Sequence, residues 1–136
     1  MTPQKIFDKV ATHLFTQGTR AMADPDCHSG QCLYRGPNGT KCAVGVLIPD
    51  KLYHRGMEMR TINGLLDDEE FVLPAWMAEN RELLWSLQCV HDQHEAWGSS
   101  MAMRSKLRAV AEAQGLDGAI LDSLLFAWED KVGEQV

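Results

Sequence analysis

The feature that most constrains this chain is a turn signal at residues 36–39, where the sequence reads Gly-Pro-Asn-Gly. Proline holds φ near about −65°, and asparagine and glycine tolerate the positive φ that closes a tight reversal. Residues that favour strands flank this turn on both sides. The pattern therefore predicts an antiparallel β-hairpin between Cys32 and Asp50.

The predicted hairpin has one apolar face. If Gly36 pairs with Thr40, the two-residue period of a strand places alternate side chains together. That face carries Cys32, Tyr34, Cys42, Val44, Val46 and Ile48. Arg35 and Lys41 lie on the opposite face, where they form a polar surface. The apolar face needs a cover, and the remaining segments have helical patterns that can supply it.

Helical periodicity covers most of the rest of the chain. Capping residues and apolar spacings of three and four residues predict helices at 3–18, 74–91, 100–115 and 117–132. Thr2 is the expected N-cap of the first helix and Pro3 its first residue. Residues 19–31 are predicted to form a loop. The pattern over residues 51–73 is mixed. It allows one or two helical turns over residues 52–59 and another over residues 62–66, with Gly56 and Gly64 as breaks.

These elements predict an α+β fold. We expect one domain spanning residues 1–136, mainly helical with four or more helices, packed on a small antiparallel β-hairpin. A chain of this length can bury enough surface to fold without disulfides.

Charge and composition narrow the classes of partner. The chain has 13 Lys and Arg against 19 Asp and Glu, a formal charge of −6. This balance argues against a nucleic acid as the main partner, because phosphate binding needs concentrated positive charge. The first residues do not resemble a signal peptide, and no apolar run approaches the roughly 20 residues of a membrane span. We therefore expect a cytoplasmic protein in a host cell, with its four cysteines as thiols or metal ligands.

The segment from Cys32 to Asp50 reads Cys-x-Tyr-Arg-Gly-x-x-Gly-x-Lys-Cys-Ala-Val-Gly-x-Leu-Ile-Pro-Asp. It resembles the signature of a family of small proteins common in bacteriophages, prophages and plasmids. The order of the other features is similar too: an N-terminal helix ending near Gly18, then a segment with His91 and Asp92, and Trp97 beyond it. The resemblance implies a phage-type context and no particular reaction.

Two clusters contain residue types that could bind zinc. The first comprises Cys27, His28, Cys32 and Cys42, and the second comprises Cys89, His91 and His94. The spacing of the first is wider than that of a zinc knuckle, and its last two cysteines fall on the core face of the predicted hairpin. On a helix Cys89 and His91 point apart, which leaves His91 and His94 as the pair that could act together. Buried cysteine commonly serves as a small hydrophobe, so we predict no cofactor.

A second chemical hypothesis is nucleophilic catalysis by Cys42 or Cys32 with His91 and Asp92. It needs a lowered thiol pKa, from a helix N-terminus or a neighbouring cation. Neither hairpin cysteine follows a helix start, and Lys41 points to the other face. The alternative interpretation of His91 is a core residue whose ring is hydrogen-bonded to a nearby backbone group. The sequence therefore favours a non-enzymatic protein.

Binding of a host protein is the function that these observations favour. The candidate partner-binding residues are basic or aromatic: Arg35, Lys41, Arg55, Arg60, Trp85 and Trp97. With the family resemblance, they predict a phage or prophage accessory protein, for which counter-defence, including inhibition of a CRISPR-type system, is the first version to test. The alternative is a small Cys/His metal-binding module or a cysteine-dependent enzyme, and nucleic-acid binding by the basic residues is a third hypothesis.

Overall fold

The computed structural model describes residues 1–23, 32–58 and 60–129, and these residues form a helical domain. Its α-helices are α1 (Pro3–Gln17), α2 (Ile62–Asp67), α3 (Ala75–Glu79), α4 (Arg81–Asp92) and α5 (Ser100–Ala113). Short 3₁₀ turns connect them: η1 (Pro37–Gly39), η2 (Gly45–Leu47), η3 (Asp50–Leu52), η4 (Arg55–Met57), η5 (His94–Trp97) and η6 (Ala119–Ser123). None of the described helices combines the length and apolar character needed to cross a membrane.

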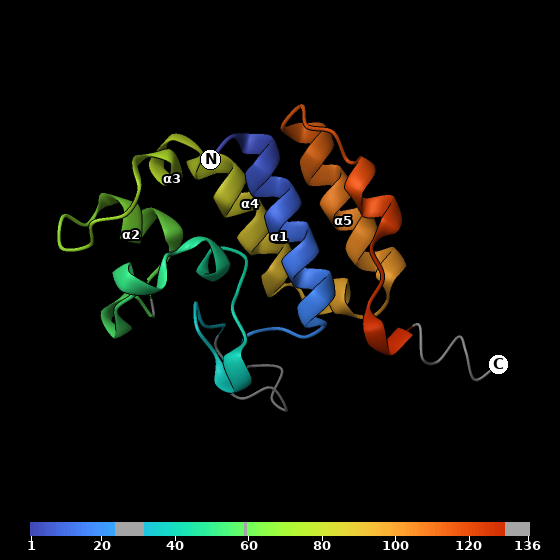
Figure 1. Cartoon of the computed structure of the whole chain (residues 1–136), viewed down its shortest axis with the longest axis horizontal. Helices are drawn as coiled ribbons and strands as arrows, with labels where there is room; N and C mark the ends of the chain where they lie inside the picture. The colour runs from blue at the N-terminus through green and yellow to red at the C-terminus, as the bar shows by residue number, and fades with distance from the viewer. Residues whose placement is uncertain (24–31, 59, 130–136) are drawn as a thin grey trace.

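Helix α1 forms the centre of the domain. Its N-cap Thr2 accepts a hydrogen bond from the backbone N–H of Lys5, and Gly18 ends it in the left-handed conformation with φ of 72°, so the predicted bounds are confirmed. Its apolar stripe is completely buried: Ile6, Phe7, Val10, Ala11, Leu14 and Phe15. Helices α4 and α5 pack against it, and α5 runs in the direction opposite to α4 (Figure 1).

Helix α5 was also predicted correctly, because Ser99 caps it by accepting from the N–H of Ala102. The segment from Pro74, by contrast, is not one helix of five turns. It breaks at Asn80, whose side-chain Nδ2 donates to the carbonyl oxygen of Trp76 at 2.7 Å. That oxygen would otherwise accept the helical N–H of Asn80, which bonds to Met77 instead. A local side-chain bond therefore separates α3 from α4.

The predicted helix from Asp117 to Val132 is wrong in the described residues. The chain forms η6 and is extended at Leu124, with φ of −103° and ψ of 131°. Arg104 of α5 donates to the carbonyl oxygens of Leu121 and Leu124. A cation from a neighbouring helix thus takes acceptors that a continuous helix would use itself. Val132 lies outside the described residues.

The predicted β-hairpin is also wrong, and with it the α+β fold class. In the described residues the pairing consists of isolated bridges, Arg35 with Lys41 and Met22 with Cys32, and no strand forms. The chain does reverse at η1, where Asn38 and Gly39 have φ of 60° and 75°. Beyond the bridge of Arg35 with Lys41, no ladder of backbone hydrogen bonds joins the two arms in the described residues.

Side chains of distant residues replace the strand partners that the hairpin needed. The backbone N–H of Lys41 donates to Gln17 of α1 at 2.7 Å, and that of Val44 donates to Gln88 of α4 at 3.1 Å. The N–H groups of Tyr34 and Arg35 both donate to the carboxylate of Glu58. Because these backbone groups have partners already, no strand ladder is needed to satisfy them.

Candidate functional site

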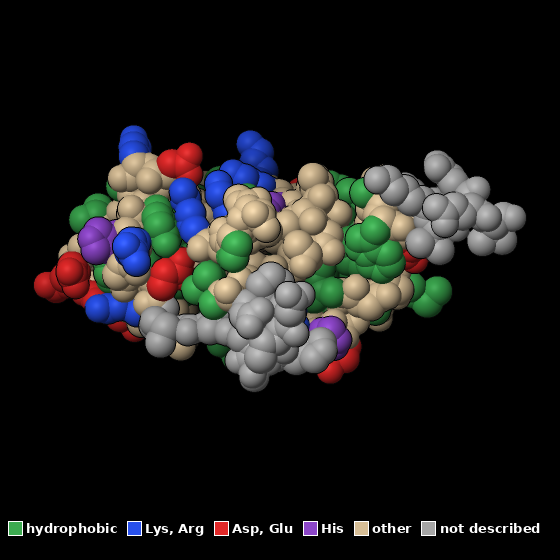
Figure 2. All heavy atoms as spheres, turned by 90° about the horizontal axis from the view of Figure 1, so that it is seen from below, with side chains coloured by type: hydrophobic (Ala, Val, Ile, Leu, Met, Phe, Trp, Pro, Cys, Tyr) green, Lys and Arg blue, Asp and Glu red, His purple; other side chains and the backbone are tan. Residues whose placement is uncertain are grey.

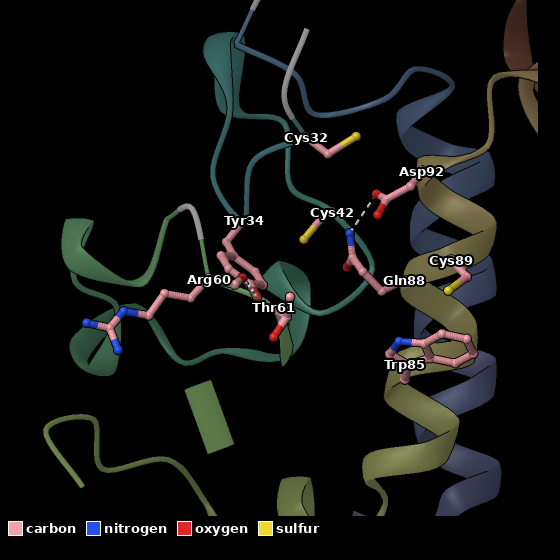
Figure 3. Close-up of a pocket in the computed structure, with 9 residues that line it drawn as sticks. All are labelled: Cys32, Tyr34, Cys42, Arg60, Thr61, Trp85, Gln88, Cys89 and Asp92. Carbon is pink, nitrogen blue, oxygen red and sulfur yellow. Dashed lines mark hydrogen bonds between the residues drawn. The ribbon is translucent and has the colours of Figure 1, made fainter. Parts of the chain in front are cut away.

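Three cysteines, an aspartate and a tyrosine line a pocket of about 260 Å³ beside α4 (Figure 3). Residues from α4 form one wall, and residues from the 32–42 and 60–61 segments form the other. The lining comprises Cys32, Tyr34, Cys42, Arg60, Thr61, Trp85, Gln88, Cys89 and Asp92. The site therefore brings together segments that are far apart in sequence.

The α4 wall follows from helical spacing. Trp85, Gln88, Cys89 and Asp92 are separated by three, one and three residues, so they lie on one face of the helix. The opposite face packs into the core through Leu83, Leu84 and Leu87. Gln88 links this wall to the other, because its Oε1 accepts from Val44 while its Nε2 donates to Asp92 at 2.9 Å.

His91, Asp92 and Cys32 form a hydrogen-bonded cluster at one end of the pocket. The ring of His91 is fully buried, and its Nε2 accepts from the backbone N–H of Ala21 at 3.0 Å. Since Nε2 must then carry a lone pair, the proton is on Nδ1, which donates to the carboxylate of Asp92 at 2.9 Å. Both ring nitrogens of His91 are thus occupied, as in the interpretation of this residue as a core histidine.

The thiol of Cys32 is held in its protonated form. Burial raises its pKa to about 12, with further contributions from the charge of Asp92 and from the hydrogen bond to that carboxylate. Burial acts against the ionised form of Asp92 too, but hydrogen bonds from His91, Cys32 and Gln88 outweigh it and hold the pKa of that carboxyl below its usual value. Asp92 is therefore an anion at neutral pH.

This geometry does not activate Cys32 as a nucleophile. Its thiol bonds to Asp92, which stabilises the protonated form, whereas an activated cysteine needs a base or a cation that favours the thiolate. Cys42 is buried and its sulfur accepts from the N–H of Gly45; burial raises its pKa to about 12 as well.

The same cluster contains three side chains of types that can bind a metal ion. A sulfur of Cys32, a ring nitrogen of His91 and an oxygen of Asp92 lie within 4.8 Å of one another. A metal on Nδ1 of His91 would require Nε2 to carry the proton, and that proton would face the N–H of Ala21. The ring is therefore in the wrong tautomer for a pocket-side ligand.

Among the described residues, the other predicted metal candidates Cys89 and His94 do not belong to this cluster. Cys27 and His28 lie outside the described residues. Cys89 lines the pocket, and burial raises the pKa of its thiol. His94 lies on η5, where its Nδ1 is 3.3 Å from the guanidinium of Arg20.

The basic candidates for partner binding largely pair with acidic neighbours. Arg35 bonds to Asp50 at 2.7 Å and covers the ring of Tyr53, and Lys41 lies 3.7 Å from the same Asp50. Arg60 pairs with Asp68, while Arg55 is exposed on η4. Figure 2 shows the consequence on one face, where basic and acidic side chains are mixed.

The two aromatic candidates differ in their surroundings. Trp97 is partly buried: it donates its indole N–H to the carbonyl oxygen of His91, and its ring stacks against Phe126. Trp85 is 53% exposed and lines both the pocket and a neighbouring hollow of about 260 Å³ formed with Asn63, Arg81 and Glu82.

Sequence reasoning missed the pocket although it named several of its residues. Tyr34, Gln88 and Thr61 were not among the candidates. The spacing of Trp85, Gln88 and Asp92 on one helical face was the available signal. Comparison of the chain with protein-family models, curated proteins and solved structures finds no match. Its function is therefore argued from its own residues.

Proposed function

We propose that this chain is a phage-type accessory protein that binds a host protein, and that the surface around Trp85 is its docking face. The observation that carries the proposal is the exposure of Trp85 between two adjacent hollows. Tryptophan is strongly enriched among the residues that dominate binding energy, and such residues lie in well-packed pockets of an interface.

The chemistry of the pocket supports binding in preference to catalysis. Its described thiols have raised pKa values, and its histidine is occupied on both nitrogens. The resemblance of residues 32–50 to a family from bacteriophages and prophages supports a bacterial host protein as the partner. Counter-defence is the version of this function to test first.

A comparison of Trp85→Ala with Met101→Ala tests the docking face. Met101 is 75% exposed on α5 and outside the pocket, so its loss controls for the removal of any large exposed hydrophobic side chain. Tagged copies of the parent and both variants would be used in pull-downs from a bacterial host lysate. We expect a protein that is retained by the parent and by Met101→Ala but lost with Trp85→Ala. Retention of the same proteins by all three would contradict the proposal.

The inhibitor version needs a functional readout. A strain in which a CRISPR-type system eliminates a targeted plasmid would express the parent or Trp85→Ala. We expect plasmid survival to rise with the parent and to stay at the background level with the variant. Efficient elimination of the plasmid in both strains would show that this CRISPR-type system is not the target. The pull-down would then be the test of host-protein binding.

One observation favours the alternative of a metal-binding module, namely the proximity of Cys32, His91 and Asp92. Elemental analysis of the dialysed protein separates it from the proposal. Zinc at one equivalent that is lost in Cys32→Ser would favour the metal module. We expect far less than one equivalent, because the tautomer of His91 opposes a ligand on the pocket side.

A further inference from the structure

We propose that the pocket beside Trp85 binds a basic side chain of the partner protein. This inference rests on the proposed function and specifies the chemistry of the partner's contact. Its starting point is charge: the carboxylate of Asp92 lines the pocket and its side chain is 45% exposed. The guanidinium of Arg60 points away from the pocket in Figure 3, toward Asp68 and the ring of Phe71.

Asp92 retains capacity to accept another hydrogen bond. His91 and Gln88 both donate to its Oδ1, and Cys32 supplies a third hydrogen bond to the carboxylate. An ionised carboxylate offers about four acceptor positions. These donors also fix the orientation of the Asp92 side chain. Binding of a cation therefore costs little free energy for ordering this carboxylate.

The walls of the pocket suit the rest of a basic side chain. The indole of Trp85 and the ring of Tyr34 offer apolar surface for a methylene stem, and an aromatic face attracts a cation. A volume of about 260 Å³ is smaller than the roughly 300–1,000 Å³ of typical small-molecule clefts. The space therefore fits one long side chain better than a cofactor.

The charge of the whole chain acts in the same direction. A formal charge of −6 attracts a basic partner surface over distances longer than a contact. Arg20 is a cation at this end of the site that opposes the attraction at short range, but it donates to the backbone oxygen of Asp92 at 3.4 Å and not to the carboxylate. The occupant is thus inferred to be an arginine or lysine projecting from a positively charged surface.

Capped amino acids provide a direct probe. Nα-acetyl-arginine methylamide and the lysine equivalent would be titrated into the isotopically labelled protein and compared with the neutral citrulline and norleucine equivalents. We expect saturable shifts of the Trp85 indole and the Gln88 side-chain amide with the cationic probes. The neutral probes should bind at least roughly fivefold more weakly than the cationic probes, because they lack the charge-assisted contact with Asp92.

Asp92→Asn should abolish the preference for the cationic probes. The control is Asp122→Asn, which removes an exposed carboxylate of η6 that pairs with Arg108 of α5, and it should preserve this preference. If Asp92→Asn fails to fold, the comparison of charged with neutral probes on the parent decides alone. Equal binding of charged and neutral probes, shifts that do not saturate, or shifts at other surfaces would each overturn the inference.

The two proposals fail separately. A host protein lost with Trp85→Ala, together with equal binding of arginine and citrulline probes, would preserve the docking face and refute the basic contact. Selective binding of the arginine probe, without any host protein that depends on Trp85, would preserve the pocket chemistry and refute the proposed function.

Discussion

At the scale of single residues, the backbone of Tyr34 lies so close to Gly45 that no larger residue fits at this position without a shift of the chain. A Cβ built on this glycine would lie 2.0 Å from the carbonyl oxygen of Tyr34 and 2.8 Å from its carbonyl carbon. Because both atoms belong to the backbone, no rotamer change can relieve the overlap. The two arms that the hairpin would have paired therefore meet here through a glycine.

We expect Gly45→Ala to lower the free energy of unfolding by about 3 kcal/mol or more, since the backbone must shift to admit the methyl group. Gly39→Ala is the matched control: Gly39 has φ of 75° but nothing within 4 Å of an added Cβ. Its cost should be about 1 kcal/mol, from the left-handed conformation alone. Urea denaturation measures both, and equal losses would contradict the close approach.

His13 gives the stability of the protein a dependence on pH. Its Nε2 lies 2.8 Å from the carbonyl oxygen of Lys41. Burial lowers the pKa of His13 below the usual histidine value of 6.5, and the hydrogen bond to Lys41 only partly opposes this effect. The unfolded chain therefore binds a proton more readily at this site than the folded chain does. The contribution of His13 is complete above pH 6.5 and is lost as the pH falls from that value toward the folded pKa.

His13→Gln keeps a donor for Lys41 and removes the titration. We expect the free energy of unfolding of the parent to fall more steeply between pH 7 and pH 5 than that of the variant, with the two curves closest near pH 7 and diverging as the pH falls. Chemical denaturation at several pH values measures this difference. Parallel curves would show that His13 has the same proton affinity in both states.

At the scale of elements, α1 holds two distant segments through glutamine side chains. Gln17 accepts from the N–H of Lys41 and donates to its carbonyl oxygen, at 2.7 and 2.9 Å. Gln4 makes the same pair of bonds to Asp117, both at 2.9 Å. Each amide thus satisfies both backbone groups of one residue, as a strand partner would.

Gln17 and Gln4 each make two hydrogen bonds to the backbone of one residue, so replacing each in turn shows how burial of such bonds affects stability. The bonds of Gln17 to Lys41 are partly buried and those of Gln4 to Asp117 are exposed. We expect Gln17→Ala to cost about 1–3 kcal/mol, because the backbone N–H of Lys41 loses its partner away from water, although the carbonyl of Lys41 keeps its bond to His13. Gln4→Ala should cost less than half as much, since water can replace its amide. Thermal denaturation compares them, and a larger loss for Gln4→Ala would contradict this assignment.

The elements that were predictable from sequence are those whose causes are local. Thr2 and Gly18 bound α1, and Ser99 starts α5, within one turn of the residues they affect. The hairpin failed because its competing partners, Gln17 and Gln88, lie 24 and 44 residues away from the groups they bind. The last helix failed for the same reason through Arg104.

At the scale of the whole molecule, the pocket was predictable only in part. Trp85 and Asp92 could be placed on one helical face from their spacing. Their position opposite Tyr34 and Cys42 depends on how the 32–42 segment docks on α4, which alternation of apolar residues did not reveal. The core position of His91 could be anticipated from its place in the apolar stripe of the helix.

Thiol reactivity tests the packing of the whole domain. Burial raises the pKa of Cys32 and of Cys42 to about 12 in each case, so neither supplies much thiolate near neutral pH. In a Cys27→Ser background, a disulfide reagent at pH 8 should modify Cys42 only as fast as the domain opens, and mild urea should accelerate the reaction. Mass spectrometry of the peptides measures the rate at which Cys42 is modified. A rate equal to that of a free, exposed thiol would contradict the burial of Cys42.

The side-chain partners of the 33–44 segment set an order of assembly. Lys41 and Val44 cannot complete their backbone bonds until α1 and α4 are in place, because Gln17 and Gln88 lie on those helices. The backbone hydrogen bonds of a β-hairpin can form without other elements. The bonds of this segment form only after both helices have packed. Its amide hydrogens should consequently exchange with deuterium at rates set by the separation of those helices, so this loop reports on the integrity of the helical layer.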